Sequence, residues 1–236
     1  MFKRILLVPL FSPLTVQAQA PVQINWGTAT VVQDLITSDG SAVSASEFKI
    51  ELGGFVGGFV PTNANIEDWV SNWQVFDAIT TPDTDPSDAF IAGSGTSSRF
   101  VGSDFLAPGQ TSLSADSNGV DIFGAGEQAY VFIRNSDTTD VGSEWLLYTS
   151  QEGNDWVFPA AQLQFSPMFF VSDVDEVLFG SVNGDLIGEG VFTDSSSDFV
   201  LRTHTFGVAV PEPTTGILLL GSTLGLLLRR KRLQSW

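Results

Sequence analysis

Short runs of Val, Ile, Phe, Tyr and Trp alternate through the middle of the chain with clusters of Gly, Asp, Asn and Ser. β-branched and aromatic residues favour strands, and the small polar residues between them favour tight turns. Strands are therefore predicted at 29–36, 47–55, 98–101, 128–135, 144–150, 174–182 and 199–206. Seven or more runs of this kind predict an all-β fold of the β-sandwich or jelly-roll type.

Two of the predicted strands show the alternation of a half-buried sheet. In the strand at 47–55, apolar residues alternate with Lys49 and Glu51, which predicts one buried and one wet face. In the last strand, Arg202 and His204 share one face. The glycine-rich segment 53–59 is expected to form a strand end and a turn.

One short helix is expected at 66–77, with Asn65 as its cap. Trp69, Trp73 and Phe76 recur at i, i+4 and i+7, so they would form one stripe on such a helix. Packing of the stripe on a sheet is one interpretation. A platform that stacks on sugars is the alternative, and its candidate side chains are Trp69, Trp73 and Trp156.

The body of the chain is strongly acidic. Between Pro21 and Pro211 it holds 26 of the 27 acidic residues but four of the ten basic ones, a formal charge of −22. Such a surface repels phosphate backbones, which excludes nucleic acid as a partner. The chain has no cysteine, so the fold must hold by packing, without disulfides or thiolate metal sites.

The first 20 residues have the layout of a secretory signal peptide. A positive start at Lys3 and Arg4 precedes a mostly apolar stretch at 5–16 and small residues near Ala18 and Ala20. Cleavage is expected after Ala18 or after Ala20. The prolines at 9 and 13 argue against a buried helix.

A second apolar segment lies near the other end, at 214–228. As a helix these 15 residues would measure about 22 Å, against a hydrocarbon core of about 30 Å. The segment is thus a short candidate for a single transmembrane helix. A basic cluster follows it and is expected to stay cytoplasmic and stop translocation. Its members are Arg229, Arg230, Lys231 and Arg232.

Pro211, Glu212 and Pro213 stand directly before this segment. The order of a Pro-Glu-Pro motif, a short apolar helix and a basic end resembles the PEP-CTERM sorting signal. That resemblance covers about the last 26 residues. It implies recognition and removal of the tail by an exosortase, an integral-membrane cysteine transpeptidase, in a Gram-negative bacterium that makes exopolysaccharide.

The body offers little that points to catalysis. His204 is its one histidine, no serine stands in a Gly-x-Ser-x-Gly elbow, and the many carboxylates nominate no glycosidase pair. We therefore expect a protein that is not an enzyme and needs no cofactor. Structural calcium is the weaker alternative to solvated turns, at Asp83, Asp85 and Asp88 or at the acids of 173–176.

Three segments are expected: a signal peptide at 1–20, a β-rich extracellular domain at 21–209 and the sorting signal at 210–236. The precursor would be anchored in the inner membrane for a time and then released to the cell surface or matrix. There it would act as a structural or adhesive protein associated with exopolysaccharide. The alternatives are a carbohydrate-binding β-sandwich and, more weakly, a glycan-active hydrolase.

Overall fold

A computed structural model describes the body of the chain. The described residues are 20–28, 33–80, 88–92, 98–151, 156–160, 166–182, 185–186 and 199–207. The larger strands are β1 (Val22–Gly27), β2 (Gln33–Ile36), β3 (Lys49–Phe55), β4 (Trp73–Ile79), β5 (Ala89–Ala92), β6 (Ser98–Leu106), β7 (Tyr130–Arg134), β8 (Glu144–Thr149), β10 (Glu176–Phe179) and β13 (Phe199–Arg202). Shorter ones are β9 (Met168–Phe170), β11 (Ser181–Val182), β12 (Asp185–Leu186) and β14 (His204–Thr205).

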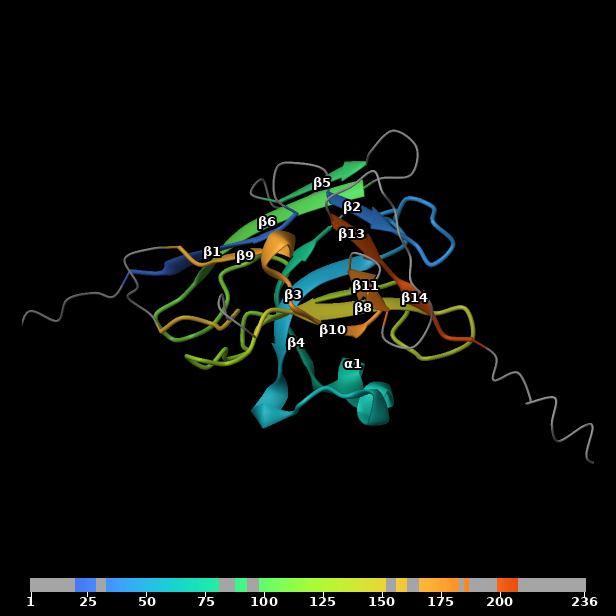
Figure 1. Ribbon diagram of the computed structural model, residues 1–236. Helices are drawn as coiled ribbons and strands as arrows, with labels where there is room; N and C mark the ends of the chain where they lie inside the picture. The colour runs from blue at the N-terminus through green and yellow to red at the C-terminus, as the bar shows by residue number, and fades with distance from the viewer. Residues whose placement is uncertain are drawn as a thin grey trace, which may run out of the picture.

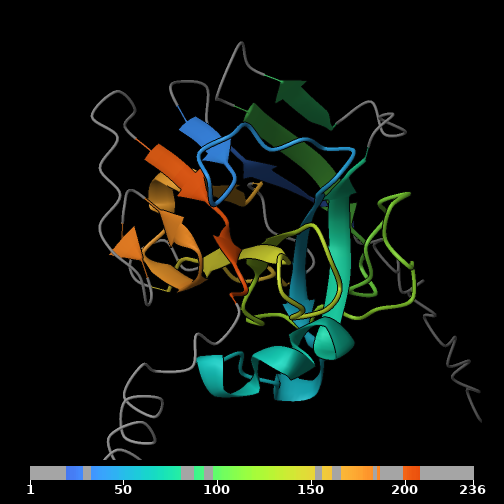
Figure 2. The ribbon, with the colours of Figure 1, turned by 90° about the vertical axis from the view of Figure 1, so that its right-hand side faces the viewer.

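These strands form three sheets (Figure 1). The first has the order β5-β6-β1-β9, and the second has the order β10-β8-β7-β3-β4 with β14 also paired to β8. The third has the order β12-β11-β13-β2. Most pairs are antiparallel, but β9 runs parallel to β1 and β13 runs parallel to β2. Figure 2 shows β13 beside β2, although more than 160 residues separate them in the chain.

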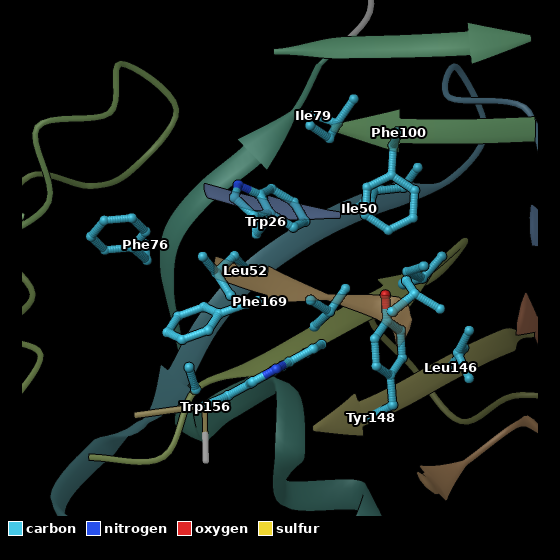
Figure 3. Close-up of a cluster of buried hydrophobic side chains, with 14 of the residues drawn as sticks. Trp26, Ile50, Leu52, Phe76, Ile79, Phe100, Leu146, Tyr148, Trp156 and Phe169 are labelled. Carbon is cyan, nitrogen blue, oxygen red and sulfur yellow. The ribbon is translucent and has the colours of Figure 1, made fainter. Parts of the chain in front are cut away.

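One hydrophobic core lies between the three sheets. The first sheet contributes Trp26 and Phe100, the second Leu52 and Tyr148, and the third Leu201, each almost completely buried. The rings of Trp156, Phe169 and Tyr148 lie close together in this core (Figure 3). Burial of apolar area on this scale is the main force that holds a chain without disulfides together.

A second cluster covers the opposite face of the second sheet. This is the side on which α1 (Trp69–Asn72) lies, below the sheet in Figure 1. It contains Trp69, Phe132 and Trp145, all nearly fully buried, with the two indole rings 6.2 Å apart. The sequence predicts a wet face here, at Lys49 and Glu51. Lys49 is exposed, but Glu51 is buried, so the prediction is wrong for Glu51.

Two hydrogen-bond donors compensate for the loss of water around the buried Glu51 carboxylate. Its Oε2 accepts bonds from Arg134 Nη1 at 2.6 Å and from Trp73 Nε1 at 2.8 Å. The guanidinium also lies 4.6 Å from the centre of the Phe132 ring. A buried carboxylate is tolerated when it is paired and hydrogen-bonded in this way.

The prediction of a helix at 66–77 is largely wrong. A 3₁₀ helix, η2 (Asn63–Asp68), leads into the single turn of α1, and Trp73 begins β4. Asn65 Oδ1 accepts a hydrogen bond from the Thr62 backbone N–H at 2.7 Å. Asn65 therefore takes part in the capping of η2, near its start. β4 pairs with β3 along its length, and this long-range pairing outweighs the local helical spacing.

The other sequence predictions identify strands correctly as strands, but they place the ends of several strands wrongly. The all-β class is confirmed, and each predicted run overlaps at least one observed strand, although residues 29–32 of the first run lie outside the described residues. β1, β4, β5, β9 and β12 are additional strands, and β6 continues five residues beyond its predicted end. The segment 53–59 is a strand end followed by the 3₁₀ turn η1 (Val56–Gly58), as expected. A further 3₁₀ turn, η3 (Val171–Asp173), follows β9. The sandwich or jelly-roll type stays a prediction.

Candidate functional site

The last described strands hold the chain just before the predicted sorting signal. β13 pairs with β2 and β11 in the third sheet, and β14 pairs with β8 in the second sheet. Phe206 N donates to Ser143 O at 2.8 Å, and Gly142 N donates back to Phe206 O at 3.0 Å. The folded body therefore holds the backbone as far as Phe206, five residues before Pro211.

A single carboxylate ties these strands to a distant loop. Glu144 Oε1 accepts Ser38 Oγ at 2.6 Å and Thr205 Oγ1 at 3.2 Å. Glu144 Oε2 accepts Thr203 Oγ1 at 2.5 Å and the Ser38 backbone N–H at 3.1 Å. Arg202 also donates to the Ser38 carbonyl. We call Ser38, Glu144, Thr203 and Thr205 the Glu144 cluster.

The electrostatics of the Glu144 cluster favour the ionised carboxylate. Partial burial by itself would raise the pKa of Glu144, but the donors of Ser38 and Thr203 outweigh it and hold the pKa below its ordinary value. The sequence shows Glu144 only as the first residue of a strand. Its four donors come from positions about 60 and about 106 residues away, so no local pattern indicates them.

Aromatic rings pack beside the same strands. Phe206 stacks on Phe179 at 4.7 Å and meets the Trp145 ring edge-on at 5.0 Å. His204 is half-buried, with its ring 5.2 Å from Phe179. His204 therefore packs against an aromatic side chain on the strand surface, in keeping with a structural role.

A second carboxyl group, Asp77 on β4, lies inside the main core. Its Oδ2 accepts Trp26 Nε1 at 2.7 Å, and its Oδ1 accepts Ser114 Oγ at 2.8 Å. Burial raises the pKa of Asp77 to about 6, although both hydrogen bonds act in the opposite direction. Asp77 stands alone among apolar residues at 75–79, and this sequence signal could have identified it.

The three tryptophans proposed for sugar stacking do not form a platform. Trp69 and Trp156 are 0% and 1% exposed, so neither ring has a free face for a ligand. Trp73 is half-buried, and its indole N–H is bonded to Glu51. The stacking prediction is wrong for Trp69 and Trp156. Trp69 is packed inside the second hydrophobic cluster, and Trp156 is packed inside the main core.

The calcium candidates are only partly described. Asp83 and Asp85 lie outside the described residues, whereas Asp88 is buried and accepts the Ser103 backbone N–H at 3.1 Å. Asp175 accepts the Gln151 backbone N–H and the Ser150 hydroxyl. In the described part of the chain, no three His, Asp or Glu side chains gather where they could hold a metal ion.

Both predicted targeting segments fall beyond the described ranges. Outside the described residues lie Ala18, the Pro-Glu-Pro motif, the apolar run at 214–228 and the basic cluster. Ala20, the other candidate cleavage residue, is within the described residues and is exposed. Over the ranges that the structure covers, no helix has the length and apolar character needed to cross a membrane.

The described structure is thus an all-β domain whose last strands pair within its third and second sheets, directly before a tail of motif, apolar run and basic residues. Comparison with protein families identifies that tail. The PEP-CTERM protein-sorting motif matches residues 209–232, a range that includes Pro211 to Pro213 and all four basic residues. The chain therefore carries the signal of an exported protein that is anchored as a precursor and sorted by an exosortase. No curated protein and no solved structure matches the chain.

Proposed function

We propose that the chain is a non-catalytic structural or adhesive protein of the cell surface or extracellular matrix of a Gram-negative bacterium. Its precursor is held in the inner membrane by the segment at 214–228 until an exosortase-like enzyme removes the tail. The released body then works among exopolysaccharides. The observation that carries this proposal is the sorting motif matched at 209–232.

The arrangement of the body supports release in a folded state. All described strands end by Thr205, and the backbone bonds of Phe206 are made within the body. Cleavage at or beyond Pro211 would therefore remove no strand of the described fold. A formal charge of −22 between Pro21 and Pro211 would keep such a body soluble outside the cell.

Mass spectrometry of the exported protein in its native host tests this proposal. We expect a C-terminus near Pro211 and a new N-terminus at residue 19 or 21. A Glu212→Ala change should leave a membrane-bound form that keeps Trp236. The matched control is Glu67→Ala, which removes an exposed carboxylate from the body and should be processed normally. An exported form that ends at Trp236 in the unaltered protein would reject processing.

A further inference from the structure

The outward face of the first sheet differs in character from the rest of the acidic body. Along β1 and β6, alternate residues point into the core, among them Ile24, Trp26 and Phe100. The residues between them point to the other side, because neighbouring side chains of a strand lie on opposite faces. This outward side carries Gln23 and Asn25 from β1 and Ser103 and Phe105 from β6.

Exposed apolar side chains gather on this face. Phe105 stands opposite Gln23, and Met168 on β9 stands opposite Asn25. Leu113 donates its backbone N–H to Phe105 O and so lies beside Phe105 on the far side of β6. Phe105, Leu113 and Met168 are 41%, 56% and 58% exposed. Exposed apolar residues that cluster in this way mark interaction surfaces.

A fixed chain of hydrogen bonds runs between these apolar groups. Gln23 Nε2 donates to Ser103 Oγ at 2.7 Å, and Ser103 Oγ donates to Asn25 Oδ1 at 2.9 Å. These bonds orient both amides and leave the Gln23 carbonyl as an acceptor and the Asn25 NH₂ as a donor. We call Gln23, Asn25, Ser103, Phe105, Leu113 and Met168 the amide-aromatic patch.

None of the six side chains of the amide-aromatic patch is ionisable, in a body with a formal charge of −22. Arg99 lies on the same outward side of β6 but four residues from Ser103, and Asp88, which accepts the Ser103 backbone N–H, is buried. An anionic ligand would be repelled by the body and would find no cation in the patch. A second copy of the chain would bring two such charges together and would have to bury the free amide groups. A neutral sugar instead offers hydroxyls to the oriented amides and a C–H face to the exposed ring of Phe105.

We propose that the amide-aromatic patch binds a neutral polysaccharide, with Gln23 and Asn25 bonding its hydroxyls and Phe105 stacking on a sugar ring. Along the strands, side chains of the same face recur about every 6.7 Å, and the strands are about 4.8 Å apart. The patch is therefore wide enough to contact more than one sugar unit. This inference rests on the proposed adhesive role and gives it a surface and a ligand class.

Binding of the purified full chain to immobilised glycans tests the inference, in a detergent without a sugar headgroup. The panel contains neutral glucans, galactans and mannans, with an acidic polysaccharide for comparison. We expect retention on at least one neutral glycan and a loss of about tenfold in affinity for Phe105→Ala or Asn25→Ala. Val60→Ala and Val141→Ala are matched controls, because both remove exposed apolar groups outside the patch.

Three results would overturn the inference. The first is retention by none of the neutral glycans, and the second is equal retention of the Phe105→Ala variant with unchanged melting behaviour. The third is a dimer in light scattering that Phe105→Ala dissociates, which would assign the patch to self-association. Since the assay uses unprocessed protein, failure of binding leaves the sorting proposal standing, and failure of sorting leaves the binding result standing.

Discussion

Single residues of this protein show how burial changes the behaviour of a carboxyl group. Glu51 and Asp77 are both buried, but Glu51 has Arg134 as an ionic partner, whereas Asp77 accepts bonds from an indole, a hydroxyl and a backbone N–H. Neutral donors stabilise a buried charge less than a cation does. Burial therefore raises the pKa of Asp77 to about 6, because the neutral donors offset it only in part.

We predict that Asp77 makes the fold more stable in mild acid. The folded state holds the Asp77 proton up to about pH 6, whereas the unfolded chain releases it near the ordinary value of 3.8, so stability rises as pH falls through 6. Between pH 7.5 and pH 5 the gain from this group is about 1.4 kcal/mol.

Denaturant unfolding at several pH values measures the effect of Asp77. Asp77→Asn keeps the shape of the side chain and should remove this part of the pH dependence. Asp68→Asn is the control, because the same change there removes an exposed carboxylate outside the core. The same slope in the Asp77→Asn variant as in the unaltered protein would contradict the prediction.

At the scale of elements, we expect the Glu144 cluster to help hold the C-terminal strands. β13 and β14 together have six residues, and short strands of this kind depend on neighbours for stability. Glu144 connects them to Ser38, in the turn that follows β2. A local opening of these strands would lengthen the free chain before the sorting motif.

We predict that Glu144→Gln loosens β13 and β14 without unfolding the sheets. The substitution removes a charged acceptor from hydroxyl bonds that each contribute about 1 to 3 kcal/mol. Amide hydrogen exchange at Thr203 and Phe206, which donate to Ile36 O and Ser143 O, should become at least about tenfold faster.

The same change at the exposed Glu67 should have no effect on exchange at either amide. Because the pKa of Glu144 is held below its ordinary value, the bonds persist at neutral pH and weaken as pH falls through that lowered pKa. Unchanged exchange in Glu144→Gln would show that strand pairing alone holds the C-terminal strands.

The whole molecule brings a strongly acidic body close to its sorting motif. Pro211 is four residues after Gly207, the last described residue, and four residues can span at most about 14 Å. This reach is less than twice the screening length of about 8 Å in physiological salt. We therefore expect an anionic membrane surface to repel the body of the anchored precursor.

We predict that the short connection is close to the minimum for processing. Deletion of residues 208–210 would reduce the reach to about 4 Å and press the acidic body against the membrane and the enzyme, so processing should slow. Replacement of the same residues by Gly-Ser-Gly should leave processing as it is. Pulse labelling in the native host, which follows precursor and released form, measures both rates. Equal rates for the deletion and the replacement would contradict the prediction.

The sequence by itself predicts the all-β class and the sorting signal. Strand propensity and turn residues act over a few positions, and the signal depends on the order of its motif, apolar run and basic residues. Both can therefore be recognised without knowing which parts of the chain meet. The acidic charge of the body likewise predicts, on composition alone, that nucleic acid is a poor partner, because net charge does not depend on how the chain folds.

Only the tertiary structure decided the features that depend on distant partners. Trp73 begins a strand because β3 lies beside it, and Glu51 is buried because a second aromatic cluster covers its face. Glu144 meets its donors, Phe105 comes to lie opposite Gln23, and Met168 opposite Asn25, through contacts between segments about 60 or more residues apart in the chain. Local spacing carries no information on such pairing, since the same residues suit either face until the register of the sheet is set.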